Sequence, residues 1–267
     1  MKAIRTFEGE LDIFLERFEH TVQSFIQEGT SAGELEQLVD DYSSFILSPE
    51  YISRWEQLVA AGVPEIVKKL QKSSALAVAV LEKHRAMKLL KGESGKADYF
   101  ENIESCIDKE FGRFQVTDES VVLLVGSGAF PMTPLLIAGR TGAKVIGIDI
   151  DEDAVTLGRQ VVERLGADLD IRIEPKPAEE LDKLNEVTHI IFSSTVDGKY
   201  KILDSLYEKT GDRVVVSMRY GNGLKSLFNF PSKSVNEEKW IIAENFIRND
   251  QIFDILIYEK AMKGGSR

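Results

Sequence analysis

Five short runs of apolar, mostly β-branched residues in the second half of the chain constrain its fold more than any other feature. They cover residues 120–127, 144–149, 170–174, 189–194 and 213–219. Continuous apolar runs of this length are typical of strands buried on both faces of a sheet. Segments with helical periodicity separate them, at 133–141, 151–165, 178–184 and 199–208. This alternation predicts a parallel sheet whose connections cross over it.

Two further strand-like runs follow, at 240–248 and 252–260, and residues 249–251 join them. A short polar connection between two such runs predicts an antiparallel hairpin. A doubly wound sheet closed by a C-terminal antiparallel pair is the shape of Rossmann-like, class I methyltransferase-type proteins. We therefore expect an α/β domain of this type over residues 116–267, which would bind a nucleotide.

The first 115 residues follow a different period. Apolar side chains recur there at spacings of three and four, which indicates amphipathic helices. The first stripe consists of Leu11, Phe14, Leu15, Phe18, Val22, Phe25 and Ile26. We predict a helical domain over residues 1–115 that lies as a lid across the carboxyl edge of the sheet. The alternative is a dimerisation bundle, and a homodimer is compatible with either role.

Charge and composition argue against several classes of function. Lys and Arg total 33 against 44 Asp and Glu, so the net charge of −11 disfavours a general nucleic-acid-binding protein. The single Cys106 precludes an intramolecular disulfide, and no two of the three His residues have zinc-ligand spacing. No run approaches the roughly 20 apolar residues of a membrane span. We expect a cytoplasmic protein with no catalytic metal, no membrane contact and no nucleic-acid partner.

A candidate nucleotide site follows the first apolar run. Gly126-Ser127-Gly128 stands between a predicted strand and a predicted helix, where glycine lets the backbone approach a ligand closely. Asp149 ends the second predicted strand, where an acidic side chain is placed to bond ribose hydroxyls. The alternative is a tight turn with Asp149 as the cap of the next helix, although Asp151 is the better cap candidate.

The same loop indicates which nucleotide binds. The dinucleotide fingerprint requires a third glycine where Pro131 stands, and proline removes a backbone N–H that a pyrophosphate would use. S-adenosylmethionine has no phosphate to bind, and the C-terminal hairpin also favours it. We therefore expect S-adenosylmethionine as co-substrate rather than NAD.

Four strings together resemble the nicotianamine synthase family. They are GSG-x-x-P-x-T at 126–133, LEKHRA at 81–86, DYFEN at 98–102, and VSMRYGNG at 216–223 with its continuation at 228–231. The resemblance covers roughly residues 75 to 231. Within the family, the helical N-terminal half is similar to the bacterial opine-metallophore branch, the staphylopine-type histidine 2-aminobutanoyltransferases. Arg85, Asp98 and Phe100 depart from the family pattern, and these departures concern the acceptor pocket more than the cofactor site.

The resemblance implies a reaction. The 3-amino-3-carboxypropyl (aminobutanoyl) group of S-adenosylmethionine would pass to the amine of histidine, expected to be D-histidine, with release of methylthioadenosine. The product would be an intermediate of a nicotianamine-like opine metallophore. By the motif match, Glu82 is the expected base for the amine, and Tyr99 would orient the amine or the carboxypropyl group. His84 is a weaker substrate-binding candidate, because it faces away from Glu82 on an ideal helix.

Other candidates stand where the predicted strands end. Arg219, followed by Tyr220, ends the fifth strand, and its guanidinium is suited to bind a substrate carboxylate. Pro131 and Thr133 would shape the pocket for the methionine end. Ser193 and Ser194 would line the cofactor. The alternatives are a surface ion pair for Arg219, a solvated helix charge for Glu82, and helix capping for the two serines.

Two other functions are compatible with these patterns. An ordinary small-molecule methyltransferase would release S-adenosylhomocysteine instead of methylthioadenosine. A non-catalytic scaffold would bind S-adenosylmethionine without turnover and use its helical half as a partner surface.

Overall fold

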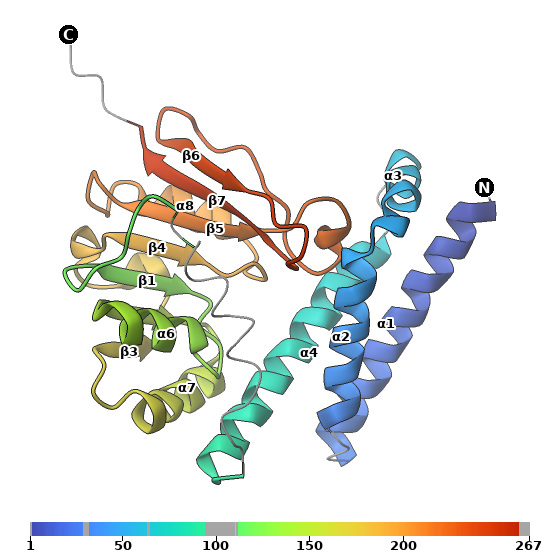
Figure 1. Ribbon diagram of the computed structural model, residues 1–267, viewed down its shortest axis with the longest axis horizontal. Helices are drawn as coiled ribbons and strands as arrows, with labels where there is room; N and C mark the ends of the chain where they lie inside the picture. Colours follow the sequence, from blue (N-terminus) through green and yellow to red (C-terminus); the bar gives the residue numbers. More distant parts are fainter. Residues whose placement is uncertain (1, 29–31, 63–64, 94–109, 111, 262–267) are drawn as a thin grey trace. The chain divides into compact units, whose positions relative to one another are not determined.

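The computed structural model describes residues 2–28, 32–62, 65–93, 110 and 112–261 (Figure 1). It divides into two compact units. The helical unit comprises Met1–His84, Tyr220–Ser232 and Ile247–Asp254, and the sheet unit comprises Arg85–Arg219, Lys233–Phe246 and Ile255–Arg267. The division is therefore not a single cut between residues 115 and 116, because two segments from the second half of the chain count with the N-terminal helices.

A seven-stranded sheet forms the centre of the sheet unit, in the order β3-β2-β1-β4-β5-β7-β6 (Figure 1). The strands are β1 (Val121–Val125), β2 (Lys144–Ile148), β3 (Ile171–Glu174), β4 (His189–Phe192), β5 (Val215–Tyr220), β6 (Trp240–Phe246) and β7 (Asp254–Lys260). The first five pair in parallel, whereas β6 and β7 are antiparallel. The predicted doubly wound α/β fold with its C-terminal hairpin is confirmed.

Three helices connect the parallel strands. They are α6 (Met132–Thr141), α7 (Glu152–Leu165) and α8 (Lys199–Leu206). The helix predicted over residues 178–184 is wrong, because the chain forms two short 3-10 turns there, η2 (Ala178–Glu180) and η3 (Leu184–Glu186). Lys183 lies between the turns in the left-handed region, with φ of 61°, and a non-glycine residue in that conformation does not continue a right-handed helix.

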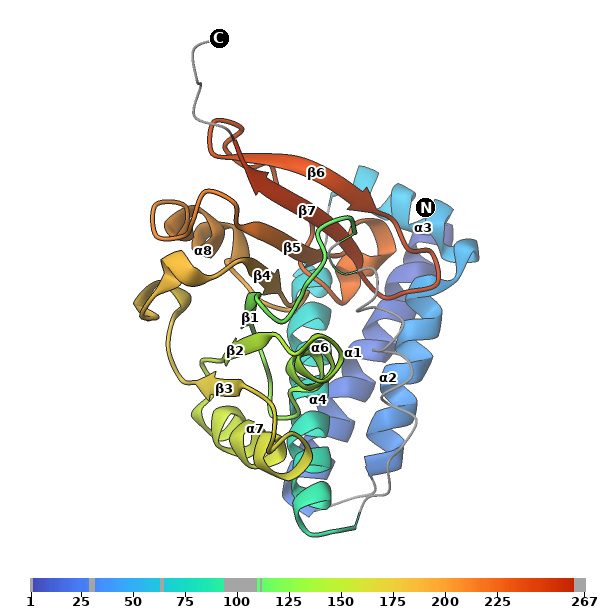
Figure 2. The same ribbon diagram turned by 60° about the vertical axis from the view of Figure 1, so that its left-hand side comes forward.

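The helical unit consists mainly of long amphipathic helices, and Figure 2 shows α1, α2 and α4 side by side. The elements are α1 (Lys2–Glu28), α2 (Ala32–Leu47), η1 (Pro49–Tyr51), α3 (Ile52–Ala60) and α4 (Glu65–Leu90), whose residues from Arg85 onward count with the sheet unit. Their apolar faces bury one core that includes Phe18, Tyr42 and Leu70. The 3-10 turn η4 (Gly223–Leu227) adds Leu224 and Leu227 to this core, which explains why it belongs to the helical unit.

Buried hydrogen bonds join η4 to the helices. The Tyr42 hydroxyl donates to the carbonyl oxygen of Leu227 over 3.0 Å. Gln71 of α4 donates from its side-chain amide to the carbonyl oxygens of Ser226 and Asn229. A buried carbonyl without a partner costs free energy, so these side chains allow the turn to be buried.

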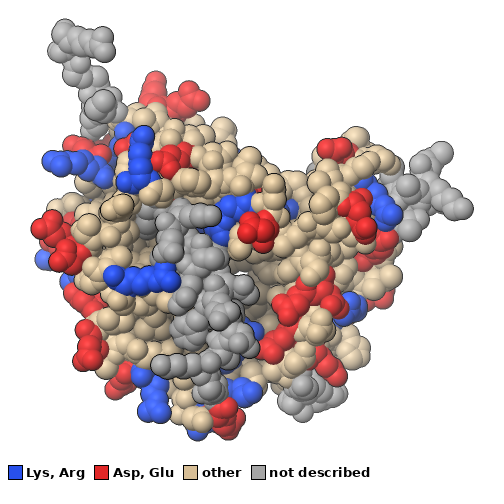
Figure 3. All heavy atoms as spheres, in the orientation of Figure 1, with Lys and Arg blue, Asp and Glu red and all other residues tan. Residues whose placement is uncertain are grey.

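No helix among the described residues is long and apolar enough to cross a membrane. On the face drawn in Figure 3, Lys and Arg side chains are interspersed with Asp and Glu side chains.

We expect Tyr42→Phe to lower the free energy of unfolding by about 1–3 kcal/mol, because it leaves the buried Leu227 carbonyl without its donor. Urea denaturation measures this value. Tyr51→Phe is the control, since Tyr51 contacts the same core but is only half-buried, and it should change stability by less than about 0.5 kcal/mol. Equal effects of the two substitutions would contradict the role given to the Tyr42 hydroxyl.

Candidate active site

The glycine loop lies directly after β1, at the carboxyl edge of the sheet. Gly126 and Gly128 have φ of 85° and 67°, the left-handed region that favours glycine. A Cβ on Gly126 would also lie 2.6 Å from Cγ2 of Val196, so a larger residue does not fit there. The backbone N–H groups of Gly126 and Ser127 both donate to the carbonyl oxygen of Ile148, at 2.9 and 3.0 Å. The loop is therefore held against the end of β2.

Asp149, the residue after β2, holds the same loop through its side chain. Its Oδ2 accepts a hydrogen bond from the Gly128 N–H at 2.9 Å, and its Oδ1 accepts one from the Asp151 N–H at 3.1 Å. Asp151 caps α7, because its side chain accepts from the N–H groups of Asp153 and Ala154. Asp149 is thus not the cap of this helix. Each carboxylate oxygen can accept a further hydrogen bond, so the arrangement is compatible with ribose hydroxyls. That contact stays a prediction.

Ser127 provides a test of whether the loop fits a polar ligand. Its Oγ is buried and has no hydrogen-bond partner among the described residues, and Ser127 is 6% exposed. Gly147 of β2 makes room for it, since a Cβ there would lie 2.9 Å from Cβ of Ser127. A buried hydroxyl without a partner is unfavourable, so a ligand that brings a polar atom to it would be stabilised. The loop is therefore suited to S-adenosylmethionine, which carries amino, carboxylate and hydroxyl groups.

The start of α6 and the loop after β4 adjoin the glycine loop. Pro131 caps α6 and is buried, together with Thr133 in its first turn. Ser193 donates from its Oγ to the carbonyl oxygen of Gly126 at 2.7 Å. The cap of α8 is Gly198, so neither Ser193 nor Ser194 caps that helix. The structure thus brings the predicted Ser193 together with the glycine loop.

Arg219 forms a buried ion pair with Glu110. Its Nη2 donates to Oε2 of Glu110 at 2.8 Å, and its Nε donates to Oε1 at 3.0 Å. The Ser217 hydroxyl donates to Oε1 at 2.6 Å, and Nη2 of Arg219 also donates to Oγ1 of Thr133 at 3.3 Å. The alternative expected for Arg219 was a surface ion pair, whereas the ion pair in the structure is buried. Binding of a substrate carboxylate stays a prediction.

Sequence reasoning missed Glu110 and Lys199. Glu110 is fully buried, and Lys199, the first residue of α8, is 1% exposed. Nζ of Lys199 donates to the carbonyl oxygens of Arg219 at 2.6 Å and Ser194 at 3.2 Å. Burial lowers the pKa of Lys199 to about 7, and the charge of Lys233 acts in the same direction. A single sequence carries no signal that separates such residues from solvated charges, because both stand among polar neighbours.

The remaining predicted residues belong to the helical unit or lie outside the described residues. Glu82 is half-buried on α4, and the ring of His84 meets Phe25 edge-on, with centroids 5.1 Å apart. Tyr220 ends β5 and is 3% exposed. Tyr99 lies outside the described residues. The structure therefore leaves the roles of Glu82, His84, Tyr99 and Tyr220 as predictions.

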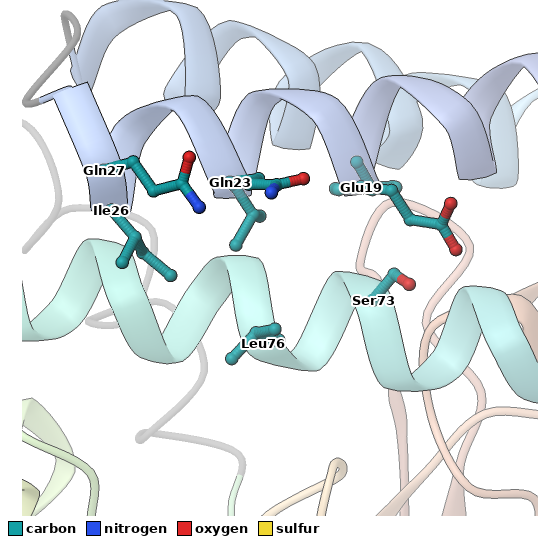
Figure 4. A pocket seen from close by; sticks show the side chains of 8 residues that line it. Glu19, Gln23, Ile26, Gln27, Ser73 and Leu76 are labelled. Carbon is teal, nitrogen blue, oxygen red and sulfur yellow. The ribbon is translucent and has the colours of Figure 1, made fainter.

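A groove between α1 and α4 does not resemble a catalytic centre. Its volume is about 500 Å³, and Figure 4 shows the side chains around it. Its lining residues are Phe18, Glu19, Val22, Gln23, Ile26, Gln27, Ser73 and Leu76. Glu19 is the one ionisable residue among them, and none was predicted as a site residue. Among the described residues of the whole chain, no three His, Cys, Asp or Glu side chains are grouped to hold a metal ion.

The nicotianamine synthase protein family model matches residues 21–261. The chain belongs to the nicotianamine synthase family. It is 34% identical over 203 residues to an L-histidine 2-aminobutanoyltransferase of Yersinia pestis, covering 73% of this chain and 74% of that protein. An L-histidine 2-aminobutanoyltransferase of Pseudomonas aeruginosa (strain UCBPP-PA14) is 30% identical over 195 residues, covering 72% and 73%.

Solved structures support the fold. The crystal structure of MtNAS in complex with MTA and tNA superposes with a TM-score of 0.74 at 14% identity, covering 96% of this chain and 98% of that one. This member of the nicotianamine synthase family therefore shares its fold over nearly its full length with that protein.

Asp149→Ala should weaken S-adenosylmethionine binding at least tenfold, or about 1.4 kcal/mol, because it removes both the expected ribose acceptor and the anchor of Gly128. Isothermal titration calorimetry measures the dissociation constant. Asp151→Ala is the matched control, since it removes a helix cap two residues away and should lower stability without changing affinity. Unchanged affinity in Asp149→Ala would place the ribose contact elsewhere.

Glu110→Gln should lower the free energy of unfolding by about 3–5 kcal/mol, because it leaves the buried guanidinium of Arg219 without its counter-charge. Chemical denaturation provides the comparison with Arg113→Gln. Arg113 pairs with Glu244 and Glu259, but its side chain is 64% exposed, so that loss should stay below about 1 kcal/mol. Similar losses of unfolding free energy in the two variants would show that a buried ion pair is no more costly to break than an exposed one.

Proposed function

We propose that this protein transfers the 3-amino-3-carboxypropyl (aminobutanoyl) group of S-adenosylmethionine to the amine of histidine and releases methylthioadenosine. The observation that carries the proposal is the similarity, over almost three quarters of the chain, to relatives named L-histidine 2-aminobutanoyltransferase. The glycine loop, with its buried unpartnered hydroxyl, supports the choice of co-substrate.

The reaction requires the amine nitrogen to attack the γ-carbon of the aminobutyrate group. The new C–N bond forms as the C–S bond breaks, and its electron pair goes to sulfur, which becomes the neutral thioether of methylthioadenosine. The attacking nitrogen, freed of one proton before the attack, becomes a secondary ammonium. Methyl is the least hindered carbon on the sulfonium, so the protein must direct attack by position, and such positioning supplies about 7–11 kcal/mol of a barrier.

In this mechanism the residues have separate tasks. Glu82 binds the substrate ammonium and accepts its proton, which leaves the nitrogen nucleophilic. Tyr99 orients the amine or the carboxypropyl group. Asp149 and the loop of Gly126 to Gly128 hold the nucleoside, with Pro131, Thr133, Ser193 and Ser194 around the rest of S-adenosylmethionine. Arg219, which is paired with Glu110, contacts the substrate. Tyr220 and His84 contact it as well.

The proposal also specifies which amino acid accepts the aminobutanoyl group. The names of the relatives specify L-histidine, so we propose L-histidine in place of the D-histidine expected from the sequence. A product with several amine, carboxylate and imidazole groups is a good metal chelator, which supports a metallophore intermediate. A homodimer and the absence of a nucleic-acid partner stay predictions.

Mass spectrometry of the purified protein with S-adenosylmethionine and each histidine enantiomer separately tests the reaction. We expect methylthioadenosine together with an L-histidine adduct that carries one aminobutanoyl unit. A reaction without histidine is the control for breakdown of S-adenosylmethionine. S-adenosylhomocysteine would instead identify a methyltransferase, and binding without turnover would favour the scaffold.

Glu82→Gln should lower kcat at least 100-fold, because general-base catalysis contributes about 10²–10⁴-fold, and should leave the dissociation constant for S-adenosylmethionine within twofold. Steady-state kinetics and calorimetry measure the two quantities. Glu65→Gln, at an exposed position on the same helix, is the control and should behave as the wild type. Normal turnover by Glu82→Gln would remove Glu82 from the mechanism.

A further inference from the structure

Lys199 joins the ends of two neighbouring strands. Its Nζ donates to the carbonyl oxygen of Ser194, just after β4, and to that of Arg219, near the end of β5. β4 and β5 pair in parallel, so both acceptors lie at the carboxyl edge of the sheet, where ligands bind in folds of this kind. One buried side chain thus connects the loop that carries the predicted cofactor serines to the strand that carries Arg219.

The hydrogen bonds continue on both sides of Lys199. Toward β1, Ser193 donates to the carbonyl oxygen of Gly126, and Gly128 donates to Asp149 at the end of β2. Toward β5, the guanidinium of Arg219 is held by Glu110 and Thr133. All these bonds lie within the sheet unit. Lys199 is therefore one link between the glycine-loop side and the Arg219 side of this edge.

Burial of a lysine at this place is unfavourable unless its amine forms hydrogen bonds. Its residue is 1% exposed, and both acceptors named above are backbone carbonyls. An ammonium has three N–H donors and a neutral amine has two, so either form satisfies the two carbonyls. The link therefore persists on both sides of the lowered pKa of about 7.

We propose that Lys199 is a positioning residue for S-adenosylmethionine, which holds the loop after β4 in its binding conformation by tying it to β5. The inference rests on the proposed function only in its choice of ligand. A loop that is already ordered in the free protein loses less conformational entropy on binding, so loss of the link should weaken binding in the folded protein.

The chain offers a matched control in Lys260. Its Nζ also donates to two backbone carbonyls, those of Tyr207 and Thr210, which follow the other end of α8 in the same unit. K199M and K260M each remove one amine and at least two hydrogen bonds and keep an apolar side chain of similar length, and K260M also removes a cation–π contact with Tyr207. Both should lower Tm, so stability alone does not separate them.

We expect K199M to raise the dissociation constant for S-adenosylmethionine about tenfold in titration calorimetry of the full chain. K260M should leave this constant within twofold of wild type. K199R, whose guanidinium supplies donors for the same carbonyls, should bind more tightly than K199M. If K199M does not fold, K199Q provides the same comparison, because its shorter amide does not reach both carbonyls.

Wild-type affinity in K199M, or equal weakening in K260M, would overturn the role of Lys199 and leave the proposed function intact. Failure of the wild-type protein to bind S-adenosylmethionine would overturn the proposed function, and the inference with it. Binding by the wild type together with selective weakening in K199M supports the role of Lys199 and the choice of S-adenosylmethionine as ligand.

Discussion

The buried ion pair between Glu110 and Arg219 is the interaction on which the ligand edge of the sheet depends. A charge removed from water is stable only when its partner and its hydrogen bonds are complete. Ser217 and Thr133 supply further hydrogen bonds to the pair, while Lys199 binds the Arg219 backbone. The pair thereby ties a residue that precedes β1 to both α6 and β5.

Other contacts hold the glycine loop. The positive φ of Gly126 and Gly128 and the close approach of Val196 to Gly126 exclude larger side chains from this backbone path. Asp149 and Ile148 then hold that path against β2. A site built on strand ends in this way is more precise than one built on loops alone, as in-line transfer from a sulfonium requires.

Much of the architecture was predictable because it is periodic. Continuous apolar runs and helical stripes identified the parallel strands, the hairpin and the amphipathic N-terminal helices. The helix predicted over residues 178–184 was wrong, because hydrophobic spacing does not reveal the left-handed conformation of Lys183. The packing of η4 in the helical core was not predictable, since Leu224 and Leu227 pack with helices far away in sequence.

For the site, the glycine loop, the acidic residue after β2 and the family strings were predictable, because each is a local pattern of residue types. The partners of the charged side chains become known from the folded chain alone. Glu110 and Arg219 are 109 residues apart, and Lys199 and Arg219 are 20 apart. Whether such a charge is solvated or buried depends on which segments fold against it, and no local pattern contains that information.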